Sequence, residues 1–285
     1  GRDKELEELY TMLEENRHVF LCGIAGIGKS ELAKAYAKHY KKHYTNILYV
    51  EYTGDLHQDT TDMDFIDDPP EISEQERFQR HNRFLRSLKS DTLLIIDNFN
   101  VSATQDSFLS VVLKYRCQIL FTTRSNLNEY CTFQLKEIQD INILFQLTSA
   151  FYSEADKYRS TVEKIIETVH YHTFAVELAA KLLENGISTP GQLLAKLQEE
   201  RASLDNEDKI KIIKDGQSSK ATYYSHIHTL FSLYALSRKQ QEPERGISEL
   251  QKLSGIIKEY HSDECLDYAK VQETLATIYL MTANL

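Results

Sequence analysis

A glycine-rich loop set between an apolar run and an amphipathic run constrains this chain more than any other feature. Residues 23–30 read GIAGIGKS, which fits the pattern G-x-x-x-x-G-K-S of a phosphate-binding loop. Residues 18–22 (HVFLC) are mostly apolar and predict a buried strand. Apolar side chains then recur at helical spacing, at Leu32, Ala33, Tyr36, Ala37 and Tyr40. A strand before the loop and a helix after it are the context that such a loop requires.

The residue types in the loop suit an anion. Gly23, Gly26 and Gly28 allow the positive φ angles and the close approach that turn backbone N–H groups toward phosphate. Lys29 supplies a mobile charge for the β- and γ-phosphates, and the Ser30 hydroxyl is placed to bind Mg²⁺. An ordinary glycine turn is the alternative. The predicted binding residues of the loop are Gly23, Ala25, Gly26, Ile27, Gly28, Lys29, Ser30 and Glu31.

Further runs alternate between strand and helix patterns. Strands are expected at 46–52 (NILYVEY), 92–97 (TLLIID), 118–123 (QILFTT) and 132–135 (TFQL), and helices at 72–88 and 104–115. This alternation predicts an α/β fold with a doubly wound parallel sheet. The acidic stretch 54–71, with two prolines, interrupts the alternation. We expect it to be a solvated, mobile insertion rather than a cation site.

Two strand ends add chemistry to the loop. Four apolar residues lead into Asp97, and a carboxylate at the end of a buried strand predicts a metal ligand that acts together with Ser30. One strand, 46–52, separates the loop from Asp97, as in additional-strand P-loop ATPases. The strand 118–123 leads into Arg124, a permanent cation that we expect to face the γ-phosphate together with the hydroxyls of Thr122 and Thr123. A surface ion pair is the alternative for Arg124.

The motifs GRDKEL, GIAGIGKS, LLIIDNF, ILFTTRS and HTFAVELAAKLL follow one another along the chain. In this order they resemble the nucleotide-binding domain of STAND ATPases of the NB-ARC type, the switch module of apoptotic and plant immune receptors and of many bacterial proteins. The resemblance spans residues 1–240. It implies that Arg2 lies beside the adenine and that Lys29 and Ser30 bind phosphate and Mg²⁺. It also implies that Asp97 is the Walker B acid and that Arg124 senses the γ-phosphate.

Three departures from the family pattern bear on catalysis. Asn98 stands where a second acid is usual, and an amide can orient water but cannot take its proton. We still count it as a catalytic residue. Residues 172–174 (HTF) replace the G-x-P motif, so that Phe174 either stacks on the adenine or belongs to a core. The M-H-D histidine has no match, because His226 and His228 come too early, and we expect residues to be missing between 240 and 242.

The resemblance and the helical periodicity predict four parts. They are a P-loop domain (1–138), a helical domain (139–204), a linker with a partial winged-helix domain (205–241) and tetratricopeptide-like helices (242–285). Ala269, Leu275, Ala276 and Tyr279 fit the first helix of such a repeat, and any amphipathic hairpin is the alternative. The chain opens at Gly1 and stops at MTANL, so we expect a fragment with an N-terminal effector outside it.

Charge and composition narrow the choice of partners. A formal net charge of -10 makes DNA an unlikely partner. A solvated helix face is the simplest interpretation of the basic residues at helical spacing, and a local basic face for nucleic acid is the alternative. These residues are Arg77, Arg80, Arg83, Arg86 and Lys89. No apolar run approaches the ~20 residues of a membrane helix, and no signal peptide is visible, so we expect a cytoplasmic protein without a membrane partner.

The motifs and the resemblance imply ATP or ADP with Mg²⁺ as cofactors. We expect a signalling switch that exchanges ADP for ATP, hydrolyses ATP slowly and forms homo-oligomers, with C-terminal repeats that sense a protein or peptide ligand. Defence signalling, for example against phage, is the expected setting. The alternatives are a scaffold that holds nucleotide without turnover and a winged-helix transcription regulator, which the acidic balance disfavours.

Overall fold

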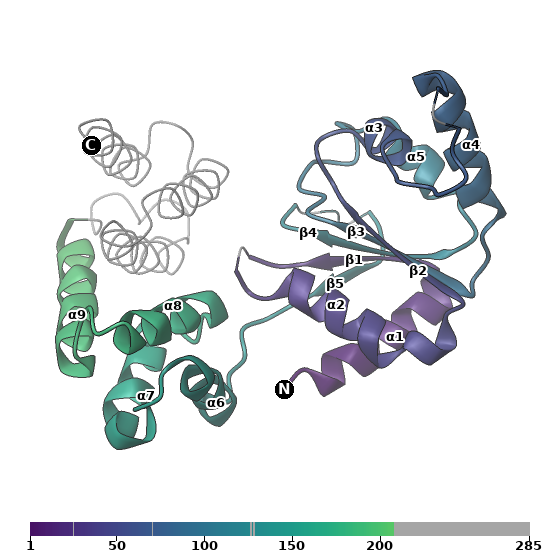
Figure 1. Cartoon of the computed structure of the whole chain (residues 1–285). Coiled ribbons are helices and arrows are strands. Elements are labelled where there is room, and N and C mark those ends of the chain that lie inside the picture. Colours follow the sequence, from purple (N-terminus) through teal and green to yellow (C-terminus); the bar gives the residue numbers. More distant parts are fainter. Residues whose placement is uncertain (25, 70, 126, 128, 208–285) are drawn as a thin grey trace. The chain divides into compact units, whose positions relative to one another are not determined.

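The computed structural model describes residues 1–24, 26–69, 71–125, 127 and 129–207. The chain forms two compact units that divide between Lys136 and Glu137. The first unit is an α/β domain and the described part of the second is helical (Figure 1). The predicted tetratricopeptide-like helices, and the winged-helix segment with His226 and His228, lie outside the described residues.

One parallel sheet forms the centre of the first unit. Its strands are β1 (His18–Cys22), β2 (Asn46–Glu51), β3 (Thr92–Asp97), β4 (Gln118–Thr123) and β5 (Thr132–Gln134). Their order is β2-β3-β4-β1-β5, and each neighbouring pair is parallel. Strand β4 therefore lies between β1, which leads into the glycine loop, and β3, which ends at Asp97. The predicted α/β fold with a parallel sheet is confirmed, and the strands end within one residue of the predicted runs.

Helices cover both faces of the sheet (Figure 1). The helices α1 (Asp3–Asn16) and α2 (Lys29–His39) pack on one face, and α3 (Leu56–Thr61), α4 (Glu74–Ser87) and α5 (Leu109–Val112) pack on the other. A 3₁₀ turn, η1 (Lys41–His43), follows α2. Along β3, Leu93 and Ile95 join the core with α1 and α2, whereas Leu94 and Ile96 join the core with α3, α4 and α5. Burial on both faces explains the continuous apolar run of this strand.

The stretch 54–71 differs from its prediction. Helix α3 forms within it, because the Asp55 carboxylate caps its first turn and the Leu56 side chain is 2% exposed. His81 of α4 is 2% exposed and contacts the stretch 54–71 through both ring nitrogens. Its Nδ1 lies 2.9 Å from the Thr60 carbonyl oxygen, and its Nε2 lies 2.7 Å from an Asp68 carboxylate oxygen. The prediction of a solvated insertion is therefore wrong for this helix, which is too short for periodicity to reveal.

The helix predicted over 104–115 is also wrong in extent, since only α5 forms there. The Asp106 carboxylate accepts bonds from the backbone N–H groups of Phe108 (2.9 Å) and Leu56 (2.8 Å). The Gln105 side chain accepts a bond of 2.7 Å from the N–H of Ser102. Such bonds between side chain and backbone compete with helix formation and shorten the helix.

The second unit begins with a bundle of helices. These are α6 (Ile141–Phe151), the 3₁₀ turn η2 (Asp156–Tyr158), α7 (Arg159–Thr168), α8 (Thr173–Glu184) and α9 (Pro190–Glu207). Each of the four α-helices buries apolar side chains, among them Leu144, Ile165, Leu178 and Leu193. The helical pattern predicted beyond residue 138 is confirmed as far as Glu207. Within the part of the chain that the structure describes, no helix is both long and apolar enough to span a membrane.

Candidate functional site

The glycine loop leaves β1 at Gly23 and enters α2 at Lys29. A Cβ atom on Gly23 would lie 3.1 Å from the carbonyl oxygen of Leu135, so a side chain would crowd the backbone there. Gly28 has a φ angle of +100°, and a Cβ atom on it would meet nothing within 4 Å. Gly26 also has a positive φ angle, of 71°, so the loop needs Gly23 for space and both Gly26 and Gly28 for backbone conformation. Ala25 lies outside the described residues.

Lys29 lies folded over the loop. Its side chain is 8% exposed, and its Nζ donates to the carbonyl oxygens of Gly23 and Ile24, each at 2.9 Å. Burial raises the pKa of the neighbouring Cys22 thiol to about 11, against the opposing effect of the Lys29 charge. The ammonium group is therefore held at the loop where phosphate is expected to bind.

Asp97 receives hydroxyl bonds from three different elements. Ser30 of α2 donates to its Oδ1 at 2.8 Å, and Thr122 of β4 donates to the same oxygen. Tyr49 of β2 donates to Oδ2 at 2.6 Å. The carboxylate is 5% exposed at the end of β3. The structure therefore brings the two predicted metal ligands, Ser30 and Asp97, into direct contact.

The backbone turns sharply after Asp97. Asn98 has a φ angle of +64°, a left-handed conformation that asparagine tolerates, and its N–H donates to the Thr122 Oγ1 at 2.9 Å. The Asn98 side chain is exposed. The predicted orientation of the Thr122 and Thr123 hydroxyls toward a γ-phosphate is wrong. Both residues are 0% exposed, Thr122 donates to Asp97, and the Thr123 Oγ1 accepts a bond of 3.0 Å from the N–H of Ser125.

Arg124 is the first residue after β4 and is half-buried. Its backbone N–H donates to the Oδ1 of Asn100 at 2.9 Å, so the segment after β3 fixes the start of the segment after β4. Both segments follow the carboxyl ends of their strands. Ligands of open α/β sheets bind at this edge, which keeps Arg124 a reasonable candidate for phosphate contact.

Arg2 reaches the far end of the loop. Its Nη1 donates to the Glu5 carboxylate at 2.7 Å and to the Lys136 carbonyl oxygen at 2.8 Å, and its Nη2 lies 3.5 Å from the Ile27 carbonyl oxygen. The predicted place of Arg2 beside the nucleotide is compatible with this contact. Glu31, the last predicted loop residue, is exposed on α2 and pairs with Lys34 at 2.9 Å.

The HTF segment begins α8 in the second unit. His172 is 0% exposed, and its Nδ1 accepts a bond of 3.1 Å from the N–H of Ala175, so this imidazole caps the helix. The ring of Phe174, a half-buried residue, lies edge-on to it with 6.5 Å between the ring centres. Stacking of Phe174 on an adenine stays a prediction.

The Ser30 hydroxyl and the Asp97 carboxylate are oxygen ligands of the kind that Mg²⁺ prefers. Across the ranges that the structure describes, no group of three or more His, Cys, Asp or Glu residues is placed to hold a metal ion. Because Mg²⁺ is usually held by one or two protein groups together with waters and substrate phosphates, this small set fits a metal that arrives with a nucleotide.

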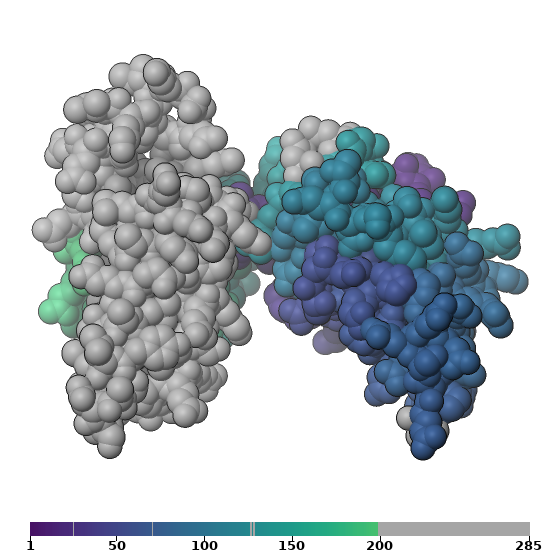
Figure 2. Space-filling view, turned by 90° about the horizontal axis from the view of Figure 1, so that it is seen from above, coloured from purple at the N-terminus to yellow at the C-terminus, as the bar shows by residue number. Residues whose placement is uncertain are grey.

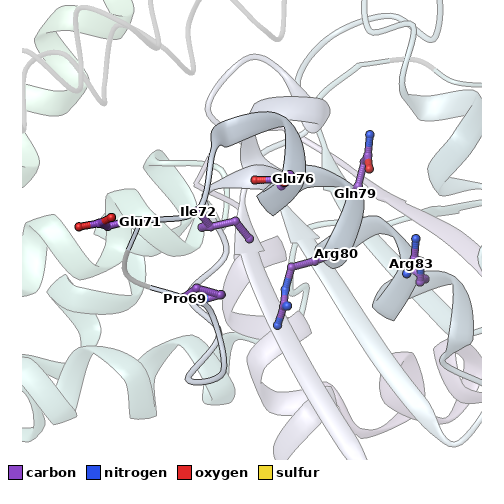
Figure 3. Close-up of a pocket in the computed structure, with 7 residues that line it drawn as sticks. All are labelled: Pro69, Glu71, Ile72, Glu76, Gln79, Arg80 and Arg83. Atoms are coloured by element: carbon purple, nitrogen blue, oxygen red, sulfur yellow. The ribbon is translucent and has the colours of Figure 1, made fainter.

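An open hollow of about 640 Å³ lies elsewhere, between α4 and the loop before it. Figure 3 shows Glu76 and Arg80 reaching from α4 toward the loop that carries Pro69 and Ile72, while Glu71 points away. In Figure 2, the blue segment that contains α3 and α4 forms one side of the first unit. The described residues that line the hollow include none of the predicted site residues, so size alone does not mark the site.

Two residues of the site, Tyr49 and Asn100, are not predicted by the sequence motifs. Tyr49 lies inside an ordinary strand pattern, and its contact with Asp97 depends on how β2 pairs with β3. Asn100 follows the Walker B strand by three residues, and its partner Arg124 is far along the chain. The one available signal for Tyr49 was a polar side chain on the strand next to Asp97.

Comparison with known proteins supports the order of motifs. The NB-ARC domain family matches residues 2–145, which is just over half of the 285 residues. No curated protein sequence matches the chain. A DNA replication initiation factor is similar in structure, with 13% identity and a TM-score of 0.45 over 99% of this chain and 94% of that chain. A Walker-type ATPase of Pyrococcus abyssi has 13% identity and a TM-score of 0.46 over 91% of this chain and 89% of its own.

Proposed function

The chain belongs to the NB-ARC family, and from this premise we propose that it is a switch driven by the exchange of ADP for ATP. The observation that carries this proposal is the bond of 2.8 Å between Ser30 and Asp97, which joins the phosphate loop to the Walker B strand. The bond brings together the Ser30 hydroxyl and the Asp97 carboxylate, the two groups that would hold the Mg²⁺ of a nucleotide complex.

We assign the binding roles to residues of the first unit. The backbone N–H groups of residues 23–30 and the start of α2 bind the phosphates, and the Lys29 ammonium group moves from the carbonyls of Gly23 and Ile24 to phosphate oxygens. Ser30 and Asp97 hold Mg²⁺, directly or through water. When bound, the metal neutralises the charge that develops on the phosphates. Arg124 would contact the γ-phosphate that distinguishes ATP from ADP.

We expect turnover to be slow. Asn98, the residue after Asp97, is exposed and can orient water, but an amide cannot accept its proton. Loss of a positioned proton acceptor typically lowers a rate by about 10²- to 10⁴-fold. Slow hydrolysis would let each nucleotide state persist long enough to signal. The same residue favours a second candidate, a scaffold that holds nucleotide without turnover.

Arg2 offers a route from the loop to the rest of the chain. Its guanidinium group contacts the carbonyls of Ile27, at the end of the loop, and Lys136, the last residue of the first unit. A nucleotide that shifts the loop would therefore act on the residue where the chain leaves this unit. We propose that the exchange frees the second unit to move and that homo-oligomers then form. Sensing through the C-terminal helices and a role in defence belong to the same proposal.

The test is to identify the nucleotide released when the purified protein is denatured, and to measure the mass of the native protein with ADP and with ATP. We expect bound ADP, and a larger mass with ATP and Mg²⁺. Phosphate release should be slow but measurable in the assembled state. Purified protein that carries no nucleotide and gives no heat with ADP or ATP would refute the switch. Stoichiometric nucleotide without any phosphate release would favour the scaffold.

A further inference from the structure

Tyr49 lies on an edge strand of the sheet, and its hydroxyl contacts the Asp97 carboxylate of the candidate metal site. Strand β2 is an edge strand, and the Tyr49 side chain is 44% exposed. In the register of β2 and β3, Tyr49 pairs with Ile95, and Glu51 pairs with Asp97. Tyr49 and Asp97 are thus diagonal neighbours on the face that α2 covers, a separation that a long aromatic side chain can bridge. The Tyr49 hydroxyl does so, at 2.6 Å from the Asp97 Oδ2.

Tyr49 donates to the one Asp97 carboxylate oxygen that receives no bond from Ser30 or Thr122. Ser30 and Thr122 both donate to Oδ1, whereas Tyr49 donates to Oδ2. The rotation of a carboxylate about its last side-chain bond has broad minima, so bonds to one oxygen leave the plane loosely fixed. A donor on each oxygen fixes the plane of the Asp97 carboxylate.

The orientation of Asp97 determines the orientation of Ser30. The Ser30 hydroxyl has one hydrogen and two lone pairs. Because the hydrogen points at the Asp97 Oδ1, the lone pairs are directed away from Asp97 and are available to a cation. A carboxylate that turned would redirect this hydrogen and the lone pairs with it.

We propose that Tyr49 is a positioning residue of the metal site, which orients Asp97 and through it the Ser30 hydroxyl for the Mg²⁺ of a bound nucleotide. This inference rests on the proposed function of the first unit. Tyr49 need not contact the nucleotide or the metal.

The test is Tyr49→Phe in the full chain, with ADP affinity measured by calorimetry in EDTA and in a series of Mg²⁺ concentrations. In EDTA we expect an affinity within about twofold of the wild type, because the phosphate loop is unchanged. With saturating Mg²⁺ we expect an affinity about three- to tenfold lower, the range of one net hydrogen bond. The Mg²⁺ concentration at half-maximal effect should rise by a similar factor.

Tyr52→Phe is the matched control. Tyr52 follows the end of β2, and its ring packs against Phe99 on the opposite face of the sheet, with 4.9 Å between the ring centres. Burial and the charge of Asp106 raise the pKa of its phenol, so this variant also removes a hydroxyl that lies near a carboxylate. We expect no change in the Mg²⁺ dependence. In an Asp97→Ala background, Tyr49→Phe should add no further loss.

Three outcomes overturn the inference. They are a wild-type Mg²⁺ dependence in Tyr49→Phe, an equal loss in Tyr52→Phe, and a loss that is as large in EDTA as in Mg²⁺. Each leaves the proposed nucleotide switch standing, since the wild type still binds ADP with Mg²⁺. A wild-type protein that binds ADP no better with Mg²⁺ than without it would refute the proposed metal site and this inference together.

Discussion

Replacing Lys29 by methionine tests the loop directly. The lysine side chain is 8% exposed, and its Nζ lies 2.9 Å from the carbonyl oxygens of Gly23 and Ile24. Methionine keeps much of the length and apolar volume and removes only the charged donor. In the bound state that donor would contact phosphate oxygens, and a hydrogen bond to a charged group contributes about 1.5–3 kcal/mol. We therefore expect the affinity for ADP and for ATP to fall about 10- to 100-fold.

Calorimetry with each nucleotide measures this loss, and the unfolding of the nucleotide-free protein shows whether the variant is folded. We expect the free energy of unfolding to change by less than about 1 kcal/mol, because the loss of two bonds is offset by removal of a buried charge. Lys34→Met is the matched control, since Lys34 lies on the same helix with 54% of its side chain exposed. A folded Lys29→Met protein with wild-type affinity would refute the phosphate-binding role of the loop.

Three further predictions concern backbone strain, metal binding and a buried carboxylate. Gly28→Ala should lower the free energy of unfolding by about 1–2 kcal/mol, because the φ angle of Gly28 is +100°. Gly191→Ala, in helix α9, should instead raise the free energy of unfolding by up to about 1 kcal/mol. Thermal unfolding measures both changes, and equal midpoints for the two variants would contradict backbone strain at position 28. Asp97→Asn should abolish the gain in ADP affinity that Mg²⁺ provides, and calorimetry that shows an unchanged gain would exclude Asp97 as a metal ligand. Burial raises the pKa of Asp59 above 3.8, although bonds from Thr53 oppose the shift. The folded protein then retains a proton that the unfolded chain has lost, so stability should fall as pH rises from 3.8 through the raised pKa, and Asp59→Asn should flatten this slope in urea unfolding.

The positions of the strands could be predicted because local sequence determines them. Every residue of β3 and β4 is buried, and burial on both faces gives continuous apolar runs that are visible without any partner. The loop was equally local, since glycines, lysine and serine at fixed spacing carry the pattern. Helices α3 and α5 were missed or overextended because the side chains of Asp55 and Asp106 decide their ends, and these bonds leave no periodic signal.

The partners within the site could not be predicted in the same way. The bond between Tyr49 and Asp97 depends on the register of β2 against β3, and the bond between Thr122 and Asp97 depends on β4 lying beside β3. Strand order depends on how all the strands of the sheet pair, and local sequence patterns do not predict it. For this reason Thr122 was assigned to the γ-phosphate when its hydroxyl in fact holds the Walker B carboxylate.

The candidate site has a metal-binding half, Ser30 with Asp97, and a phosphate-binding half, the loop with Lys29. Nucleotide binding must rearrange these two halves to different extents. Ser30 donates its one hydrogen to Asp97 and keeps lone pairs for a cation, so the metal-binding half has its ligand geometry before any ligand arrives. Lys29 instead directs donors at the carbonyls of Gly23 and Ile24, so phosphate must replace those bonds. Nucleotide binding would therefore alter the loop more than the Walker B strand. The loop is also the part that contacts Arg2, which in turn contacts Lys136 at the end of the first unit. A nucleotide signal would therefore leave this unit from the loop rather than from the metal-binding half.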